Sequence, residues 1–254
     1  MAREPAKCVG PGIDMTDKRQ RQVYLLVTAG GSGTRMGASV PKQFLELGGK
    51  AILHRTIEKF VNAVPDVKVV TVLPEAQVET WKEYCLMRDF LCPQRIVCGG
   101  LTRFHSVRNG LEAVPDGVLV AVHDGVRPLL SEAFVRQMVL RAQEVPALVP
   151  VLPCVDTMKA LRRNPSTGEL ETVEGVMVDR SLLYAAQTPQ IFHSELLKKA
   201  YGQAYETAFT DDASVAAKAG IPLSYILGER GNIKITTPED LDLARAVMSL
   251  SFCF

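Results

Sequence analysis

The sequence predicts an α/β protein built on a mostly parallel sheet with helices on both faces. Short apolar runs rich in β-branched residues alternate along the chain with segments whose apolar residues recur at helical spacing. Apolar residues make up 47% of the 254 positions and charged residues 22%, which is ordinary for a globular protein. Such an alternation favours parallel strands joined by helices that cover the sheet.

Continuous apolar runs indicate the strands, because a strand buried on both faces has no polar side. The five clearest runs cover residues 23–28, 67–73, 95–98, 118–123 and 147–152. Towards the C-terminus, PLSYIL (222–227) and NIKITT (232–237) are two further expected strands. The sheet is therefore expected to draw on most of the chain.

Helical spacing of apolar residues marks the helices between these runs. Ile52, Ile57 and Phe60 share one face of a helix predicted over 51–63. The same pattern predicts helices over 101–114, over 131–144 with Ser131 as N-cap, from about 193, over 211–220 with Gly220 as its stop, and from 237 with Thr237 as N-cap and Pro238 at the first helical position.

Residues 1–22 are expected to form a flexible leader and residues 23–254 a single domain. Residues 155–180 interrupt the α/β rhythm with alternating stretches around the turn sequence NPSTGE, which predicts a protruding β-hairpin arm. An isolated hairpin is only marginally stable, so we expect the arm to pack on another subunit and form a homodimer. A solvated loop is the alternative.

Charge and cysteine content exclude several classes of function. The 29 Lys and Arg residues balance 28 Asp and Glu residues, so no overall field favours nucleic acid or a membrane. The six cysteines contain no CxxC pair, the four histidines show no metal-binding spacing, and no secretory signal or membrane-spanning run of about 20 apolar residues is present. We expect a cytoplasmic protein in which local clusters bind anions.

A glycine-rich segment follows the first expected strand, where α/β proteins bind ligands. The sequence VTAGGSGTRMGASVPKQF places Gly30, Gly31 and Gly33 ahead of Arg35 and Lys42. Glycines let backbone N–H groups approach a polyphosphate, and a guanidinium together with an ammonium suits a triphosphate. The alternative is a tight turn with incidental surface cations.

Two familiar phosphate-binding templates do not fit this segment. No glycine here is followed by Gly-Lys at the spacing of the P-loop G-x-x-x-x-G-K-[ST]. The dinucleotide fingerprint G-x-G-x-x-G fits Gly31 and Gly33 but meets Met36 in place of the third glycine, and its acidic partner about 20 residues further on is missing. A dinucleotide oxidoreductase is therefore disfavoured.

The segment GSGTRM…PKQF resembles the signature of pyrophosphorylases of the sugar-nucleotide type, and its PKQ form is similar to that of cytidylyltransferases. Further blocks are similar, in the same order, to those of the 2-C-methyl-D-erythritol 4-phosphate cytidylyltransferase family of the non-mevalonate isoprenoid pathway. These blocks are CGGLTRFHSV (98–107), VHDGVRP (122–128), DTMK (156–159), VDR (178–180), QTPQIF (187–192), FTDDAS (209–214) and NIKITTPEDL (232–241). So many blocks in one order make the resemblance specific.

The resemblance implies a Rossmann-like nucleotidyltransferase fold, a swapped arm and a homodimer. It implies transfer of CMP from CTP to 2-C-methyl-D-erythritol 4-phosphate, with release of pyrophosphate and with Mg²⁺ or another divalent cation as cofactor. The residues fit this chemistry without a general base, because a phosphate monoester with a second pKa of about 6 is largely dianionic at neutral pH. The reaction needs fixed cations instead.

The family's motifs map onto this sequence residue by residue. The resemblance assigns catalysis at the CTP phosphates to Arg35 and Lys42. It assigns CTP binding to Ala29, Gly30, Gly31, Ser32, Gly33, Gly100, Ser106 and Asp124, and metal binding to Asp124. It assigns substrate binding to Arg127, Thr157, Arg180, Thr188, Thr210 and Lys234, with Thr157 and Arg180 reaching the neighbouring subunit's substrate phosphate.

Several of these residues also have structural explanations. Asp124 follows an expected strand, where it would meet Mg²⁺ and substrate hydroxyls or serve as a turn residue. Arg127 would hold a phosphate or pair with Asp124. The structural alternatives for the others are an ion pair of Arg180 with Asp179, a helix N-cap at Thr210, and a solubility role on an edge strand for Lys234.

Two other functions are the alternatives: a cytidylyltransferase for another polyol phosphate such as ribitol 5-phosphate, and a non-catalytic nucleotide-binding module. The HDGVRP block departs from the two alanines that often follow the aspartate, and Leu101 stands where some members have an acid. The DTMK, VDR and TDDAS blocks favour methylerythritol phosphate, and the intact pair of Arg35 and Lys42 speaks against a non-catalytic module.

Overall fold

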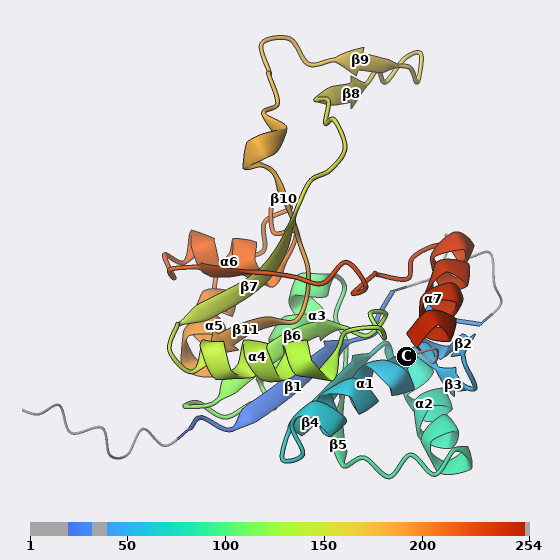
Figure 1. Ribbon diagram of the computed structural model, residues 1–254. Coiled ribbons are helices and arrows are strands. Elements are labelled where there is room, and N and C mark those ends of the chain that lie inside the picture. Colours follow the sequence, from blue (N-terminus) through green and yellow to red (C-terminus); the bar gives the residue numbers. More distant parts are fainter. Residues whose placement is uncertain (1–19, 32–39, 252–254) are drawn as a thin grey trace, which may run out of the picture.

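The computed structural model describes residues 20–31 and 40–251, which form an α/β molecule with one projecting arm (Figure 1). Its main sheet has eight strands: β1 (Val23–Thr28), β4 (Lys68–Leu73), β5 (Gln94–Cys98), β6 (Leu119–Asp124), β7 (Ala147–Pro153), β10 (Tyr184–Ala186), β11 (Gln190–His193) and β12 (Ser224–Leu227). They lie in the order β10-β7-β11-β6-β1-β4-β5, with β12 beside β7. The six strands expected between residues 23 and 227 are all present.

The sheet is mostly parallel, as the sequence predicts. Strand β1 pairs in parallel with both β4 and β6, β4 with β5, and β7 with β12. Strand β11 runs antiparallel between β6 and β7, and β10 runs antiparallel to β7. The sequence analysis did not predict β10 or β11.

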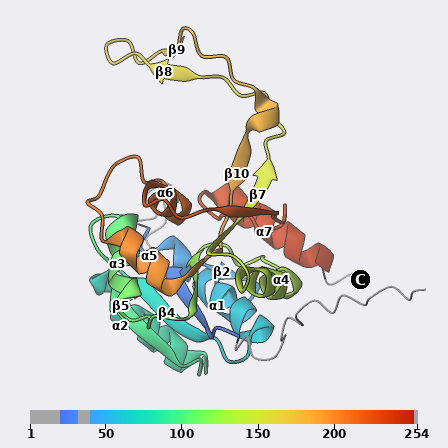
Figure 2. The same cartoon turned by 90° about the vertical axis from the view of Figure 1, so that its left-hand side faces the viewer.

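Helices cover both faces because alternate residues of the strands point to opposite sides. Leu25 and Val27 of β1 face one core, which contains α1 (Ile52–Ala63) and α4 (Glu132–Ala142). Leu26, between them, faces a second core. The helices that build this second core are α3 (Arg103–Leu111), α5 (Ser194–Tyr201) and α6 (Asp212–Lys218), on the other side of the sheet (Figure 2).

A smaller third core lies beside α1. It joins the short hairpin of β2 (Glu46–Leu47) and β3 (Lys50–Ala51) to α7 (Pro238–Ser251), with Leu47, Ile235 and Leu241 among its buried residues. The helix α2 (Glu75–Met87) closes the first core and buries Trp81. The sequence analysis predicted neither α2 nor this hairpin.

Helix caps explain where several helices begin. The Ser131 hydroxyl accepts a hydrogen bond from the Phe134 N–H at 3.1 Å, so the predicted N-cap of α4 is confirmed. The N-cap of α6 is Asp211 rather than Thr210, because the Asp211 carboxylate accepts the Ser214 N–H at 2.8 Å. The structural explanation considered for Thr210 is therefore wrong.

Residues 155–180 contain a β-hairpin that projects from the sheet (Figures 1 and 2). Strands β8 (Leu161–Arg163) and β9 (Leu170–Thr172) pair antiparallel, which confirms the predicted hairpin. At its base the Arg180 Nη1 donates to the Val155 carbonyl at 2.8 Å. The hairpin leaves apolar side chains exposed, with Met177 97% and Leu170 61% accessible.

Two observations bear on the ends of the chain and on membranes. Most of the predicted leader, residues 1–19, lies outside the described residues, but Arg21 is held by an ion pair with Glu195 at 2.8 Å. Within the described ranges, no helix combines the length and the apolar character that crossing a membrane requires.

Candidate active site

Two adjoining cavities lie at the carboxyl ends of β1 and β6, where α/β sheets bind ligands. The first, of about 280 Å³, is lined by the end of β1, by Lys42 and by residues 100–103. The second, of about 240 Å³, extends towards β11 and α6. Arg103, Asp124 and Lys234 line both cavities, so the two meet at these side chains.

The glycine-rich segment forms one wall of the first cavity. Residues 29–31 line it directly. Three further predicted residues lie outside the described part of the chain: Ser32, Gly33 and Arg35. A Cβ on Gly31 would stand only 3.0 Å from the Lys42 Cε, so the glycine lets the lysine lie against the backbone.

Lys42 opens the short 3-10 helix η2 (Lys42–Phe44), which is anchored on two sides. The buried Gln43 donates from Nε2 to the Ala29 carbonyl at 2.7 Å, and this ties the turn to the end of β1. Phe44 stacks on Trp81 with ring centroids 6.1 Å apart. The lysine therefore projects from a fixed backbone. The sequence analysis did not single out Gln43.

The opposite wall is the turn from β5 into α3. The Ser106 hydroxyl accepts from the Gly100 N–H at 3.0 Å and donates to the Thr102 carbonyl at 3.0 Å. A side chain on Gly100 would overlap the Cβ of His105. Gly100 and Ser106 are thus in direct contact, and both line the first cavity.

Asp124 is the electrostatic centre of the site. Its carboxylate lies 3.0 Å from the Lys234 ammonium, 3.3 Å from the Arg127 guanidinium and 3.7 Å from that of Arg103. Burial opposes ionisation, but these cations outweigh it and hold the pKa of Asp124 well below its usual range. Asp124 is therefore an ionised carboxylate surrounded by positive charge.

Lys234 and Arg127 reach Asp124 from two different segments. Lys234 lies on an irregular extended segment, and the strand predicted over 232–237 is wrong. The Ile235 N–H donates to the Val126 carbonyl at 2.9 Å instead of joining a sheet ladder. Arg127 is fixed by donating from Nη1 to the Asn232 carbonyl at 2.7 Å.

The side-chain hydroxyl of Thr188 contacts the backbone N–H of Asp124. Burial lowers the pKa of His123 to about 3, and its Nε2 faces the Arg127 carbonyl at 3.4 Å, so the ring proton resides on Nε2. Thr188 Oγ1 then donates to His123 Nδ1 at 2.9 Å and accepts the Asp124 N–H at 3.1 Å. A ligand meets only the remaining lone pair of this hydroxyl.

The other predicted substrate residues divide into two groups. Thr210 lines the second cavity, at the start of the turn before α6. Thr157 and Arg180 are exposed on the arm and line neither cavity of their own chain. A role for these two at a substrate requires the cavity of another subunit.

Sequence reasoning missed Arg103, although it stands within the quoted block CGGLTRFHSV. It is the first residue of α3 and lines both cavities. Its Nη1 and Nη2 donate to the two carboxylate oxygens of Asp212 at 3.0 and 2.7 Å. The available signal was a cation three residues after Gly100, at the start of a predicted helix.

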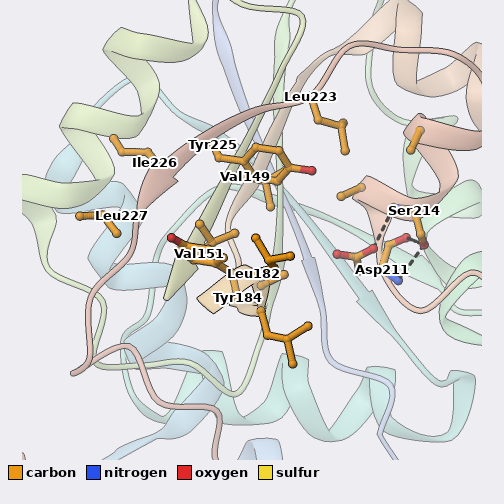
Figure 3. Close-up of a pocket in the computed structure, with 14 residues that line it drawn as sticks. Val149, Val151, Leu182, Tyr184, Asp211, Ser214, Leu223, Tyr225, Ile226 and Leu227 are labelled. Atoms are coloured by element: carbon orange, nitrogen blue, oxygen red, sulfur yellow. Dashed lines mark hydrogen bonds between the residues drawn. The ribbon is translucent and has the colours of Figure 1, made fainter. Parts of the chain in front are cut away.

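A third, larger cavity of about 860 Å³ lies between β7, β12, α6 and the base of the arm. Its lining is mostly apolar, with Leu182, Tyr184, Tyr225 and Leu227 beside it (Figure 3). These four side chains are between 53% and 76% exposed. This cavity adjoins the second polar cavity at Ala186 and Asp211, and its apolar lining suits contact with another apolar surface.

Cations and an ionised carboxylate gathered at the strand ends of a mostly parallel sheet suit the binding of phosphorylated ligands, and the comparisons with known proteins identify the class as an α/β nucleotidyltransferase. The family model described as 2-C-methyl-D-erythritol 4-phosphate cytidylyltransferase (IspD) matches residues 23–250. The chain belongs to this family. The resemblance read from the sequence blocks and the Rossmann-like nucleotidyltransferase fold are both confirmed.

Relatives with the same description match over nearly their full length. The chain is 46% identical over 231 residues to the 2-C-methyl-D-erythritol 4-phosphate cytidylyltransferase of Porphyromonas gingivalis, covering 91% of this chain and 99% of that protein. It is 43% identical over 223 residues to the one from Bacteroides fragilis, covering 88% and 98%.

Solved structures agree with this family. The structure of the Thermus thermophilus 2-C-methyl-D-erythritol 4-phosphate cytidylyltransferase is similar, with 31% identity, a TM-score of 0.64, and coverage of 89% of this chain and 98% of that one. The 4-diphosphocytidyl-2C-methyl-D-erythritol synthase from Anaerococcus prevotii has 26% identity and a TM-score of 0.71, with coverage of 91% and 97%.

Proposed function

We propose that this enzyme transfers the cytidylyl group of CTP to 2-C-methyl-D-erythritol 4-phosphate, giving 4-diphosphocytidyl-2-C-methyl-D-erythritol and pyrophosphate. The observation that carries the proposal is the junction of two cavities at Asp124, Arg103 and Lys234. A nucleotide in the first cavity and an alcohol phosphate in the second would bring their phosphates together there. Family membership over residues 23–250 supports the same reaction.

The acceptor phosphate is its own nucleophile in this reaction. Its second pKa of about 6 leaves it mostly dianionic at neutral pH, so no side chain has to remove a proton. One of its oxygens attacks the α-phosphorus of CTP and forms the new P–O bond, while the bond from that phosphorus to the bridging oxygen of pyrophosphate breaks. The protein supplies alignment and positive charge.

Lys42 and Arg35 would stabilise the triphosphate, and the backbone of residues 29–33 would approach it closely. The placement of Lys42 against Gly31 supports this role for the lysine. Gly100 and Ser106 would bind the cytosine base at the opposite wall, where their mutual hydrogen bond fixes the turn. Such fixed donors avoid reorganisation when charge builds up at the α-phosphate.

Arg127 and Lys234 would bind the acceptor phosphate. Both pair with Asp124, at 3.3 and 3.0 Å. An arriving phosphate offers these cations a stronger partner than one shared carboxylate, because it carries up to two charges on three oxygens. Thr210 would contact the acceptor from the far wall, and Thr188 would act mainly by holding Asp124.

Mg²⁺ fits this site only with help from the nucleotide. Among the described residues, no group of three or more His, Cys, Asp or Glu side chains is placed to hold a metal ion. Asp124 is one ionised carboxylate, and Mg²⁺ is commonly held by one or two carboxylates together with substrate phosphates. When bound, the ion would neutralise charge on the triphosphate.

The arm would complete the site of a second subunit in a homodimer. Thr157 and Arg180 line neither cavity of their own chain, and the arm exposes Leu170 and Met177. The apolar surface around Leu182 and Tyr225 offers a place for such contacts (Figure 3). We also infer a cytoplasmic location, which agrees with the free thiols of the four described cysteines.

Pyrophosphate release from a substrate panel tests the proposal. Purified protein would be incubated with Mg²⁺, with CTP, UTP or ATP as donor, and with 2-C-methyl-D-erythritol 4-phosphate or ribitol 5-phosphate as acceptor. We expect the highest kcat/KM for CTP with the methylerythritol phosphate. Faster release with ribitol 5-phosphate, or none with any acceptor, would contradict the proposal.

A further inference from the structure

The guanidinium of Arg103 stands at the point where the two cavities of the active site meet. It lines both, and its Nε lies 3.7 Å from Oδ1 of Asp124. Lys42 lines only the first cavity and Arg127 only the second. Arg103 is therefore the arginine best placed among the described residues to meet both phosphates at once.

Arg103 is held by a buried carboxylate from another helix. Asp212, at the start of α6, is fully buried and accepts from Nη1 and Nη2 of Arg103 at 3.0 and 2.7 Å. Tyr201, at the end of α5, donates its hydroxyl to Asp212 Oδ1 at 2.6 Å. Three helices thus converge on one guanidinium, and its position does not depend on a loop.

The pairing with Asp212 leaves the arginine charged and still able to donate. Burial opposes the charge, but Asp212 and Asp124 outweigh it and raise the pKa of Arg103 above its ordinary value. A guanidinium has five N–H groups, of which Asp212 uses two. Of the other three, the Nε–H faces Asp124 at 3.7 Å, which leaves one N–H on each of Nη1 and Nη2 for phosphate oxygens.

We propose that Arg103 is a further catalytic residue, which contacts the transferring α-phosphate at the junction, and that Asp212 and Tyr201 are positioning residues that act through it. This assignment rests on the proposed cytidylyl transfer. It differs from the roles of Lys42 and Arg127, because Arg103, like Lys234, lines both cavities, whereas Lys42 and Arg127 each line one.

The first test is Arg103→Lys, which keeps the charge. A lysine ammonium cannot bind Asp212 with two parallel N–H groups and also reach the junction at the same time. We expect kcat to fall by about 10²–10³ with KM for CTP nearly unchanged. The melting temperature should also fall, because the buried Asp212 loses its bidentate partner, so kinetics are measured well below the unfolding transition. Arg108→Lys, an exposed arginine on the same helix, is the matched control and should behave as wild type. A kcat for Arg103→Lys within about threefold of wild type would overturn the assignment.

The second test separates positioning from general destabilisation. Tyr201→Phe removes one hydrogen bond to Asp212, and we expect kcat to fall roughly tenfold with little change in KM. Added to Arg103→Lys, it should cause no further loss, whereas independent multiplication of the two effects would overturn the positioning role. Tyr205→Phe, another ring that packs on Phe104, is the control.

The same assay separates the two proposals from each other. If wild-type protein releases no pyrophosphate from CTP with any acceptor, the proposed function fails and the assignment of Arg103 fails with it. If the wild type is active and Arg103→Lys equals it, only the assignment fails. A wild-type kcat for Tyr201→Phe, with Arg103→Lys impaired, would remove the positioning role of the tyrosine.

Discussion

At the end of β1, Gly31 and Lys42 lie so close that a Cβ at position 31 would stand 3.0 Å from the lysine Cε. Across the cavity, Gly100 leaves room for His105 at the start of α3 in the same way. Neither glycine has a positive φ; the close approach requires glycine at position 100, whereas at position 31 the end of the lysine side chain would have to shift slightly. The shape of the first cavity thus depends on the missing Cβ atoms at positions 31 and 100 and on the position of the Lys42 side chain.

Lys42→Ala should lower kcat by about 10²–10³, because one fixed charge near the α-phosphate is lost. The unfolding free energy should change little, since the turn is anchored by the buried Gln43 and by the partly buried Phe44, which stacks on Trp81. Steady-state kinetics and urea denaturation measure the two effects. Lys82→Ala, on the exposed face of α2, is the control, and wild-type turnover in Lys42→Ala would remove the lysine from the mechanism.

His123 should make stability depend on pH below neutrality. Burial lowers its pKa from the usual 6.5 to about 3, so the unfolded chain binds a proton that the folded chain refuses. This contribution is present above pH 6.5 and is lost as pH falls from 6.5 towards 3, at about 1.4 kcal/mol per pH unit. Urea unfolding of wild type and His123→Gln at about pH 7 and about pH 5.5 should show the steeper loss in wild type.

Parallel losses in wild type and His123→Gln would contradict this account of His123. Burial also lowers the pKa values of His54 and His193, which makes stability fall with pH in the same direction. Wild type and His123→Gln should therefore both lose some stability at the lower pH. An NMR titration of the His123 imidazole in wild type gives an independent check. The ring should stay neutral with its proton on Nε2 at about pH 5.

Most of the charged residues that line the two polar cavities could be named from the sequence and its family blocks, but their connections could not. Lys42, Asp124 and Lys234 stand out as cations or an acid beside strands and turns in the sequence. The pairing of Arg103 with Asp212 joins residues 109 positions apart, and no local pattern encodes such a contact. Likewise Thr188 was predicted to bind substrate, while its tie to His123 becomes visible only in three dimensions.

At the scale of elements, the hydrophobic pattern predicts what is buried on a regular face. The strands β1, β4 and β6 were predicted to within about a residue because they are continuous apolar runs. Helix α2 was missed because it buries only Trp81, so its apolar period is weak. Apolar and polar residues alternate over 232–237 as in a strand, yet the segment joins no sheet. Its backbone is held to the neighbouring segment by the hydrogen bond from the Ile235 N–H to the Val126 carbonyl.

The start of α4 offers a test at this scale. Ser131→Ala removes the N-cap hydrogen bond to the Phe134 N–H and the contact of the hydroxyl with Glu229, so the unfolding free energy should fall by about 1 kcal/mol. Ser131→Thr keeps the cap and is the control. Urea denaturation measures the change, and kcat should not move because Ser131 lines neither polar cavity. An unchanged midpoint would show that the cap does not stabilise α4.

Across the whole molecule, charge is nearly balanced but unevenly placed. Lys and Arg exceed Asp and Glu by one in the sequence, whereas Lys42, Arg103, Arg127 and Lys234 gather around the two polar cavities. The function therefore depends on a local field and not on net charge. Among the predicted site residues that the structure describes, Thr157 and Arg180 of the arm are the ones that line neither polar cavity.

Complementation between subunits tests whether the arm acts on its partner. Lys42→Ala and Arg180→Ala should each be nearly inactive alone. In a mixed dimer one site has both lysine and arginine intact, so random mixing after co-refolding should restore about a quarter of wild-type activity. If Arg180 served its own chain, mixing would restore nothing beyond the average of the two parents.

The central claim is that one junction of two cavities brings CTP and an alcohol phosphate together among fixed cations. A crystal structure with CTP and Mg²⁺ tests it most directly. We predict the triphosphate in the first cavity, with the Lys42 Nζ about 3 Å from a phosphate oxygen and the cytosine against Gly100 and Ser106. Nucleotide bound elsewhere, with that cavity empty, would contradict the claim.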